Sequence, residues 1–229
     1  MKLLHKCFSF NNYVLDAKVA QNEIGALYDS KAWFYDAWAY FTESKARYRA
    51  LELAEIKNNQ SIIEVAVGTG LMFSDIVQRN PNGQNIGIDI SQGMLSKAKR
   101  RLSKYQNNNY SLSIGSAFNL KVNDDSIDML VNNYMFDLIP FNQMDSIIDE
   151  FYRVLKPNGK VMLINMTKSE RFGASLYENL YRFSPRLMGG CRGVQLTELL
   201  TRHGFCIKVR EYIFAVRLIQ FPQYLNIME

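Results

Sequence analysis

The residues best suited to chemistry form one stretch, Ser61–Gly70, which reads S-I-I-E-V-A-V-G-T-G. A short apolar, β-branched run ends in an acid, Glu64, and is followed by a Gly-x-Gly turn. This order is typical of a buried parallel strand that delivers its backbone to a ligand. We therefore interpret the stretch as the first strand and the nucleotide-binding loop of the protein.

Three kinds of Gly-rich loop could account for this stretch. A phosphate-binding P-loop needs Gly-Lys-Ser/Thr after the turn, whereas Gly70 is followed by Leu71 and Met72. A dinucleotide loop needs a third glycine at position 73, which is Phe73. The first kind is excluded, and an NAD-dependent oxidoreductase stays open only as a remote alternative.

The segments that must position these residues alternate between strand and helix patterns. Strands are predicted at Ser61–Ala66, Asn85–Ile90, Tyr110–Gly115, Ser126–Asn132, Lys160–Asn165, Phe205–Ile213 and Tyr224–Ile227. Helices are predicted at Leu71–Gln78, from the N-cap Ser91 to Lys104, and at Gln143–Leu155, Ala174–Phe183 and Gln195–Arg202. This alternation predicts an α/β fold with right-handed βαβ units, a parallel sheet and helices on both faces.

A parallel sheet of this kind binds its ligand outside the carboxyl ends of the strands, near the point where the strand order reverses. Gly68, Asp89, Ala117 and Asn133 all lie at or just after predicted strand ends. We therefore expect them around one crevice. Two plainer roles remain open at this stage, because Asp89 could cap the helix after Ser91 and the asparagines could satisfy a strand end.

The length and composition favour one core with an N-terminal extension. The chain has 229 residues and is 48% hydrophobic, within the range of a single α/β domain. Residues 1–56 are predicted to be a helical extension or lid packed on the core, and residues 57–229 the core itself, with a helical insert at 168–190. Seven aromatic residues fall within Tyr28–Phe41. They predict either an amphipathic helix docked on the core or an aromatic lid over a ligand.

The charge and the cysteines exclude several classes of partner. The net charge of +5 is spread among 22 acids, which disfavours nucleic acid as a partner. Cys7, Cys191 and Cys206 form no C-x-x-C pair, so we predict no metal site and reduced thiols. No stretch reaches the ~18 apolar residues of a membrane span. These features predict a cytoplasmic protein without a transmembrane segment.

Four motifs in chain order carry a resemblance to a known family. They are E-V-A-V-G-T-G at 64–70, D-I-S at 89–91, G-S-A-F-N-L at 115–120 and V-L-K-P-N-G-K at 154–160. Together they resemble the class I S-adenosylmethionine-dependent methyltransferases, and are most similar to the branch that holds the ubiquinone and menaquinone C-methyltransferases and small-molecule or lipid methyltransferases. The resemblance implies a Rossmann-like seven-stranded methyltransferase fold, mostly parallel with one antiparallel strand, and an N-terminal helical lid.

The resemblance also implies a cofactor, S-adenosyl-L-methionine, with S-adenosyl-L-homocysteine as its product. Glu64 would orient the methionine ammonium group, directly or through water, and Asp89 would accept both ribose hydroxyls. Ile90 and Met94 would sandwich the adenine. The other cofactor-binding residues that the resemblance implies are Tyr28, Ala66, Gly68, Gly70, Ser116, Ala117 and Asn133.

The chain departs from the family pattern at two of these positions. Ala66 stands where the first glycine of the loop usually lies, and a methyl group is tolerable there if the backbone does not need a positive φ. Ser116 replaces an aspartate that accepts from the adenine amino group, and a hydroxyl would accept more weakly. These departures keep open a non-catalytic S-adenosylmethionine-binding or scaffold protein on the same fold.

Methyl transfer is an in-line displacement, so positioning the acceptor behind the methyl group supplies much of the rate. No metal is required. If the acceptor needs deprotonation, Tyr134, Asp137 and Tyr35 are the available groups, because His5 lies near the terminus and His203 in a helix-ending turn.

The aromatic stretch and the 168–190 insert predict a hydrophobic or aromatic small-molecule acceptor, such as a quinone precursor or a lipid. A lipid would bring peripheral membrane contact and make a set of arginines candidate headgroup ligands, namely Arg171, Arg182, Arg186 and Arg192. A solvated surface is the plainer explanation of those charges. The assembly is expected to be a monomer or a homodimer.

Overall fold

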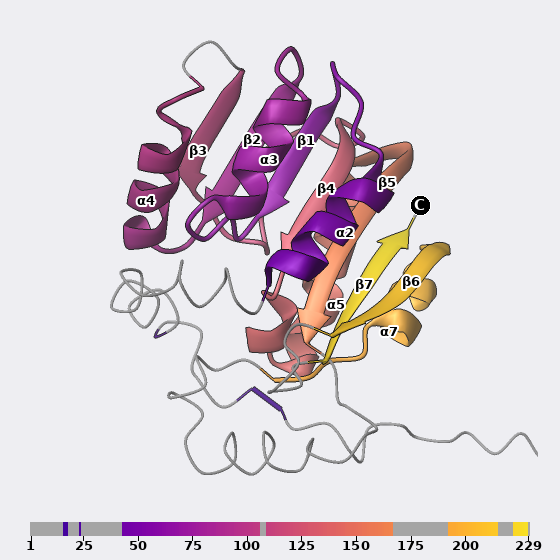
Figure 1. The fold of residues 1–229 in the computed structure, drawn as a ribbon. Helices are drawn as coiled ribbons and strands as arrows, with labels where there is room; N and C mark the ends of the chain where they lie inside the picture. The colour runs from indigo at the N-terminus through magenta and orange to yellow at the C-terminus, as the bar shows by residue number, and fades with distance from the viewer. Residues whose placement is uncertain are drawn as a thin grey trace, which may run out of the picture.

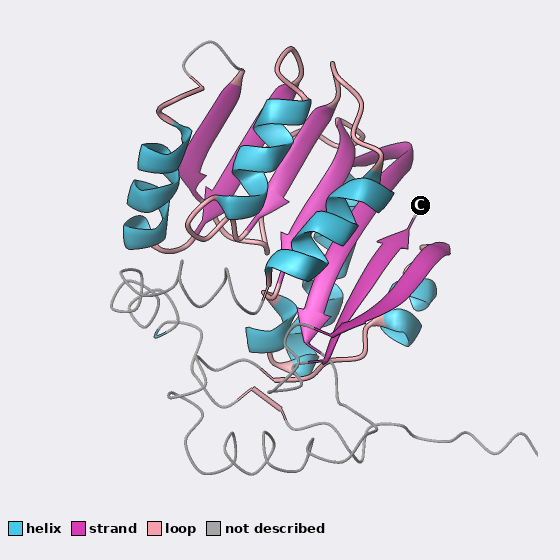
Figure 2. Cartoon of the chain, viewed as in Figure 1, coloured by secondary structure: helices cyan, strands magenta, loops and turns pink. Residues whose placement is uncertain are grey.

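The computed structural model describes residues 16–17, 23, 43–105, 109–166, 192–214 and 222–228. Apart from residues 16–17 and 23, the predicted lid up to residue 42, with Tyr28 and Tyr35, lies outside the described residues, as does the 168–190 insert. Within the described part, strands and helices alternate along most of the chain (Figure 2).

The strands are β1 (Ser61–Val65), β2 (Gln84–Asp89), β3 (Tyr110–Ile114), β4 (Ile127–Asn133), β5 (Leu155–Met166), β6 (Ile207–Phe214) and β7 (Pro222–Met228). The helices are α2 (Ser44–Ala54), α3 (Leu71–Arg79), α4 (Gln92–Leu102), α5 (Phe141–Val154) and α7 (Thr197–Arg202), with the short 3-10 helix η2 (Phe136–Leu138).

These strands form one sheet in the order β3-β2-β1-β4-β5-β7-β6. The first five run parallel, and β7 is antiparallel to both of its neighbours, β5 and β6. The chain moves outward from β1 to β3 and then returns to place β4 on the other side of β1, which puts the reversal of strand order between β1 and β4. The predicted α/β architecture with a parallel sheet is confirmed, and the reversal marks where a ligand crevice belongs.

Helices cover both faces of the sheet. Figure 1 shows α2, α3 and α4 in front of the strands, with α5 behind them. The alternating side chains of the strands feed separate apolar clusters on the two faces. For example, Ile63 of β1 packs in the cluster that includes α5, and its neighbour Ile62 packs in the cluster that includes α2. Each face of the sheet is thus packed by its own apolar cluster, and together the two clusters fix the strand ends relative to one another.

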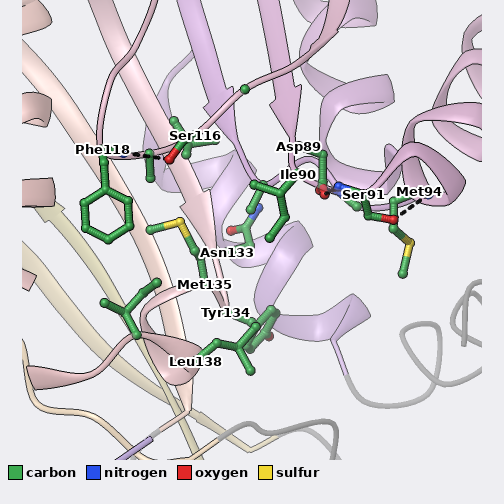
Figure 3. Close-up of a pocket in the computed structure, with 16 residues that line it drawn as sticks. Asp89, Ile90, Ser91, Met94, Ser116, Phe118, Asn133, Tyr134, Met135 and Leu138 are labelled. Carbon is green, nitrogen blue, oxygen red and sulfur yellow. Dashed lines mark hydrogen bonds between the residues drawn. The ribbon is translucent and has the colours of Figure 1, made fainter. Parts of the chain in front are cut away.

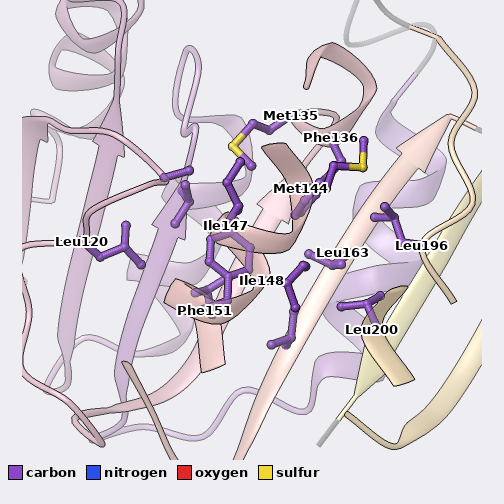
Figure 4. Packing of buried hydrophobic residues seen from close by; sticks show 14 of the residues in the cluster. Leu120, Met135, Phe136, Met144, Ile147, Ile148, Phe151, Leu163, Leu196 and Leu200 are labelled. Carbon is purple, nitrogen blue, oxygen red and sulfur yellow. The ribbon is translucent and has the colours of Figure 1, made fainter. Parts of the chain in front are cut away.

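Helix α5 shows why the sequence pattern predicts its position. Ile147, Phe151 and Val154, spaced four and three residues apart, are all fully buried. Phe151 also packs edge-to-face on Phe136, with ring centroids 5.9 Å apart (Figure 4). Burial of each such side chain contributes about 1.5–3 kcal/mol, so this one stripe holds the helix against the sheet.

Strand β5 begins at Leu155, whereas the sequence predicts a strand that begins at Lys160. Ile127 pairs with Leu155 and Met129 pairs with Lys160, so the register shifts between these pairs. The extra residues form a bulge in which Asn158 adopts a φ of 63°. The predicted start of the strand at Lys160 was wrong, because β5 already pairs with β4 at Leu155, before the bulge, and pairs with it again from Lys160 onward.

None of the helices in the described ranges is long and apolar enough to cross a membrane.

Candidate functional site

The carboxyl ends of β1, β2 and β4 open onto a cavity of about 800 Å³, its open mouth included (Figure 3). Its lining residues are Val65, Ala66, Gly68, Asp89, Ile90, Ser91, Met94, Gly115, Ser116, Ala117, Phe118, Asn133, Tyr134, Met135, Leu138 and Ile139. A smaller cavity of about 450 Å³ shares part of this wall and continues toward α2. The strands therefore gather residues that are up to 74 positions apart, from 65 to 139, around one crevice, as the sequence predicts.

The loop after β1 separates the two cavities, and two of its glycines have different roles. Gly68 lines both cavities, and a Cβ there would meet no atom within 4 Å, so its backbone is open to a ligand. Gly70 lines neither cavity. A Cβ on Gly70 would lie 3.0 Å from the Cβ of Ala98, so this glycine allows α3 to approach α4 closely.

Ala66 carries backbone strain at the centre of the site. The sequence-based expectation was that its methyl group is tolerable if the backbone does not need a positive φ, but the structure places its φ at 62°. A side chain in the left-handed region costs about 1–2 kcal/mol because Cβ approaches the following carbonyl oxygen. Non-glycine residues with such strain gather at functional sites, and Ala66 lines both cavities.

The variant Ala66→Gly is expected to raise the free energy of unfolding by about 1 kcal/mol, because glycine adopts the positive φ without strain. Urea denaturation followed by circular dichroism measures the change. As a matched control, Ala50→Gly in the middle of α2 should lower the free energy of unfolding by about the same amount. A lower free energy of unfolding in Ala66→Gly than in the wild type would contradict the conclusion that the backbone at Ala66 is strained.

Asp89 ends β2 and joins the loops after β1 and β2. Its Oδ2 accepts from the backbone N of Gly68 at 2.8 Å, and its Oδ1 accepts from the backbone N of Ser91 at 2.9 Å. The residue is 8% exposed and lines the larger cavity. Each carboxylate oxygen can accept a further hydrogen bond, so Asp89 presents two oriented acceptors to the cavity.

The helix after Asp89 begins as predicted. The Ser91 side chain caps α4 by accepting from the backbone N of Met94 at 3.0 Å. Ile90 and Met94 both line the larger cavity, the first 47% exposed and the second buried. Capping thus falls to Ser91, and Asp89 holds the loop that leads into the helix.

Glu64 is a buried carboxyl group on the wall of the smaller cavity. Its Oε1 accepts from Nδ2 of Asn133 at 3.2 Å, whereas its Oε2 and the Oδ1 of Asn133 have no hydrogen-bond partner among the described residues. Burial raises the pKa of Glu64 well above its ordinary value, against the hydrogen bond from Asn133, which lowers it. Two unsatisfied acceptors side by side suit a ligand that brings donors, above all a cation.

Arg47 of α2 reaches the same cavity, and the sequence analysis did not select it. Its side chain is 12% exposed, and its Nε lies 3.4 Å from Oδ2 of Asp75. Two other basic residues lie within two positions of it in α2, so spacing alone does not single it out. The packing of α2 on the sheet decides which of them faces the site.

Ser116 begins a tight turn that lines the larger cavity. Its Oγ accepts from the backbone N of Phe118 at 3.3 Å, and its backbone oxygen accepts from the backbone N of Asn119 at 3.2 Å. The hydroxyl that the sequence analysis expected to contact a ligand is therefore already engaged by its own turn. Ala117 lines the cavity beside it.

The end of β4 supplies the remaining wall. Asn133 and Tyr134 line both cavities, and Tyr134 adopts a φ of 56° while its backbone N donates to the oxygen of Ile164 at 2.7 Å. The apolar side chains of Met135, Leu138 and Ile139 follow. Sequence analysis stopped at Tyr134, although an apolar run directly after a strand end could have indicated this wall.

Asp137, predicted as a catalytic group, is fully buried and lines neither cavity. Its Oδ2 accepts from the backbone N of Met166 at 3.0 Å and its Oδ1 from Nδ2 of Asn165 at 3.2 Å. Burial raises its pKa to about 8. These contacts tie η2 to the end of β5, and the carboxyl group lies outside the lining of both cavities.

Arg192 is also placed differently from the expectation that it could contact a lipid headgroup. It is 2% exposed, and its guanidinium donates to the backbone oxygens of Phe136, Asp137 and Ile139. Of the four arginines in that expectation, the other three lie outside the described residues. No group of three or more metal-ligating side chains occurs in the described ranges.

Comparisons with known proteins agree with this geometry. Residues 56–198 match the family described as Methyltransferase domain. A demethylmenaquinone methyltransferase of Symbiobacterium thermophilum is 34% identical over 123 residues, which cover 51% of this chain and 48% of that protein. A demethylmenaquinone methyltransferase of Lactobacillus johnsonii is 27% identical over 186 residues, covering 76% and 75%. The chain spans half or less of the length of the first curated relatives that it matches.

A solved structure shares the fold. Phosphoethanolamine N-methyltransferase 2 of Haemonchus contortus, in complex with S-adenosylhomocysteine, superposes with a TM-score of 0.68 at 18% identity, covering 85% of this chain and 47% of that one. The family match spans more than half of the 229 residues and includes every strand end that forms the crevice. The chain therefore belongs to the methyltransferase-domain family, and it is similar to demethylmenaquinone methyltransferases.

Proposed function

We propose that this chain transfers the methyl group of S-adenosyl-L-methionine to a small hydrophobic or aromatic acceptor of the quinone-precursor type. The family supports the reaction class, and the demethylmenaquinone methyltransferases among its relatives support the acceptor class. The single observation that carries the proposal is the pair of carboxyl groups on either side of one loop. Asp89 faces the larger cavity with two oriented oxygens, and Glu64 faces the smaller with an unsatisfied one.

The residues present fit this cofactor. S-Adenosylmethionine has a purine, a ribose diol and an amino-acid end that carries an ammonium and a carboxylate group. The larger cavity offers an apolar slot with a carboxylate at one side, as a purine and a diol require. The smaller cavity offers unsatisfied buried acceptors and a guanidinium, as an amino acid requires.

Each residue then has a distinct binding role. Asp89 accepts the two ribose hydroxyls, since its oxygens are already oriented by backbone amides. Glu64 and Asn133 accept from the ammonium group, which favours the ionised form of Glu64. Arg47 pairs with the carboxylate group, and the open backbone at Gly68 lets the ligand pass between the two cavities.

The bound cofactor supplies an electrophilic methyl group on a sulfonium sulfur. The contribution of the chain is to hold the acceptor in line behind that methyl group and to exclude water from it. Asn133 and Tyr134, which line both cavities, border the point where the cavities meet. Three residues were predicted as acid–base groups, and Tyr134 is the one of them that lines the cavities in the part of the chain that the structure describes. Tyr134 is therefore the candidate for moving a proton.

The acceptor binds against an apolar wall. Met135, Leu138 and Ile139 supply it from the end of β4. The proposal assigns the rest of the acceptor pocket to the N-terminal helical lid of residues 1–56 and to the insert at 168–190, both set on a seven-stranded methyltransferase core of residues 57–229. The aromatic composition of both segments supports this assignment.

Two measurements test the proposal. Calorimetry of the full chain with S-adenosyl-L-homocysteine is expected to show one binding site per chain. Incubation with methyl-labelled S-adenosylmethionine and a panel of quinols is expected to give a product heavier by one labelled methyl group. An absence of binding would refute the proposal.

The same measurements separate the alternatives. Binding without transfer to any quinol, lipid or cell-extract acceptor would favour the non-catalytic or scaffold protein. The NAD-dependent oxidoreductase would be supported only if NAD competed with S-adenosyl-L-homocysteine for binding. Control reactions contain unlabelled cofactor, so that a mass shift arises only from the transferred group.

A further inference from the structure

We propose that His203 is a pH-sensitive clasp that fastens residues 192–204 to helix α5, and that this hold weakens when the imidazole ring loses its proton. The clasp is a property of the fold and does not depend on methyl transfer. Three features carry the proposal: the two contacts of the ring, the charged groups around it, and what residues 192–204 hold in place.

Both nitrogen atoms of the His203 ring contact carboxyl groups of α5. Nδ1 lies 2.7 Å from Oδ1 of Asp149, and Nε2 lies 2.9 Å from Oδ1 of Asp145. An ionised carboxylate only accepts hydrogen bonds, and a neutral imidazole ring carries a single N–H donor, whereas the protonated ring carries two. Both contacts are therefore hydrogen bonds when the ring is protonated and positively charged.

Loss of the proton turns one of these two contacts from attraction into repulsion. A lone pair of the neutral ring would then face Oδ1 of Asp145 at 2.9 Å or Oδ1 of Asp149 at 2.7 Å. The two acids are four positions apart in α5, so they project from one face of that helix and repel each other. The positive ring offsets this repulsion and the neutral ring does not, so its deprotonation weakens the hold on α5.

The charged groups around the ring set the pH range of the clasp. Besides the two acids of α5, Arg202 of α7 places Nη2 3.0 Å from Oδ1 of Asp145, and Tyr152 of α5 packs on the chain just after His203. The hydrogen bonds to Asp145 and Asp149 raise the pKa of His203 above its ordinary value, against burial, which lowers it. The clasp is therefore complete below the ordinary pKa of histidine, about 6.5, and is lost as the pH rises through the raised pKa.

Residues 192–204 connect the clasp to the wall of the larger cavity. At their start, Arg192 donates to the backbone oxygens of residues 136, 137 and 139, a stretch that lines this cavity. Between the two ends, Leu196 and Leu200 are buried in the cluster that includes α5 (Figure 4). The clasp thus fastens the end of a segment whose start supports the cavity wall.

Proton NMR of the full chain tests the contacts of the ring. The chain holds two histidines, His5 and His203, so the spectrum of His5→Gln assigns the ring signals. The signals of His203 are expected to titrate at a higher pH in the wild type than in Asp149→Asn, because an amide keeps the shape of the carboxylate and removes its charge. Equal titration midpoints in the two chains would overturn the inference.

Hydrogen exchange detected by mass spectrometry tests the hold on residues 192–204. Rates are measured at about pH 6 and about pH 8.5, and each is divided by the intrinsic exchange rate at that pH. Protection of these residues is expected to fall about two- to fivefold more in the wild type than in His203→Gln, whose residue 203 does not titrate.

Two controls accompany this measurement. Peptides from α4, which packs near the β3 edge of the sheet, should show the same pH dependence in both chains. Circular dichroism checks that His203→Gln folds, and the NMR titration of the wild type tests the clasp without that variant. If protection of residues 192–204 depends on pH equally in the wild type and in His203→Gln, His203 is not a pH-sensitive clasp.

Discussion

Replacing Asp89 with asparagine is expected to weaken the binding of S-adenosyl-L-homocysteine by about 100-fold or more. The carboxylate accepts from the backbone N atoms of Gly68 and Ser91 and, in the proposed complex, from both ribose hydroxyls. Asparagine keeps one acceptor oxygen and turns its NH2 group toward one of those backbone donors, so one loop contact becomes repulsive. Two hydrogen bonds to a charged group are lost or weakened, at about 1.5–3 kcal/mol each.

Isothermal titration calorimetry measures this effect directly. Asp128 provides a matched control, because its carboxylate also accepts from a backbone N, that of Ser61 at 2.7 Å, and from Nζ of Lys156 at 2.7 Å. It lies next to the amino end of β1, away from both cavities. Asp128→Asn should leave the affinity for S-adenosyl-L-homocysteine unchanged. If Asp89→Asn binds this ligand as tightly as the wild type does, Asp89 does not bind the cofactor.

The second large effect is expected on stability. Replacing Arg192 with methionine should lower the free energy of unfolding by about 3–5 kcal/mol, because it leaves buried polar groups without their partner. The Arg192 guanidinium donates to three backbone oxygens between residues 136 and 139, at 2.7–3.2 Å, and contacts Oδ1 of Asp16 at 3.3 Å. It also stacks 4.4 Å above the ring of Phe141.

Urea denaturation of the full chain tests this prediction. Arg202→Met is the control, since the Arg202 side chain is 62% exposed and its ion pair with Asp145 should contribute less than about 1 kcal/mol. The carbonyl groups that Arg192 holds belong to the segment that supplies Leu138 and Ile139 to the cavity wall. Weaker cofactor binding should therefore accompany the lost stability. A change below about 1 kcal/mol in Arg192→Met would show that water or a side-chain rearrangement satisfies the carbonyls.

The sequence was most informative where one local pattern sets both an element and its role. Ser61–Gly70 predicts a buried strand and an open loop, and the structure places β1 and the backbone at Gly68 accordingly. The N-cap at Ser91 and the buried stripe of α5 were predicted for the same reason. Capping and helical periodicity depend on residues a few positions apart, so the sequence carries them directly.

Boundaries and backbone angles were less predictable. Strand β5 begins five residues before the predicted Lys160, because the bulge near Asn158 lets pairing with β4 continue. The φ of Ala66 depends on how the loop must turn between β1 and α3, and alanine itself gives no sign of a left-handed conformation. In both places the surrounding structure overrides the local preference of the residue.

The sequence by itself determined the α/β class, the loop after β1, and the positions of Asp89 and Glu64 at strand ends, because each follows from an alternation or spacing within a short window. The tertiary structure decided which charged groups face a ligand. It turns Arg47 toward the smaller cavity, buries Asp137 and Arg192 against main-chain groups of other segments, and commits Ser116 to its own turn. These outcomes depend on packing between residues distant in sequence, and the burial and hydrogen-bond partners that set them exist only in the folded chain.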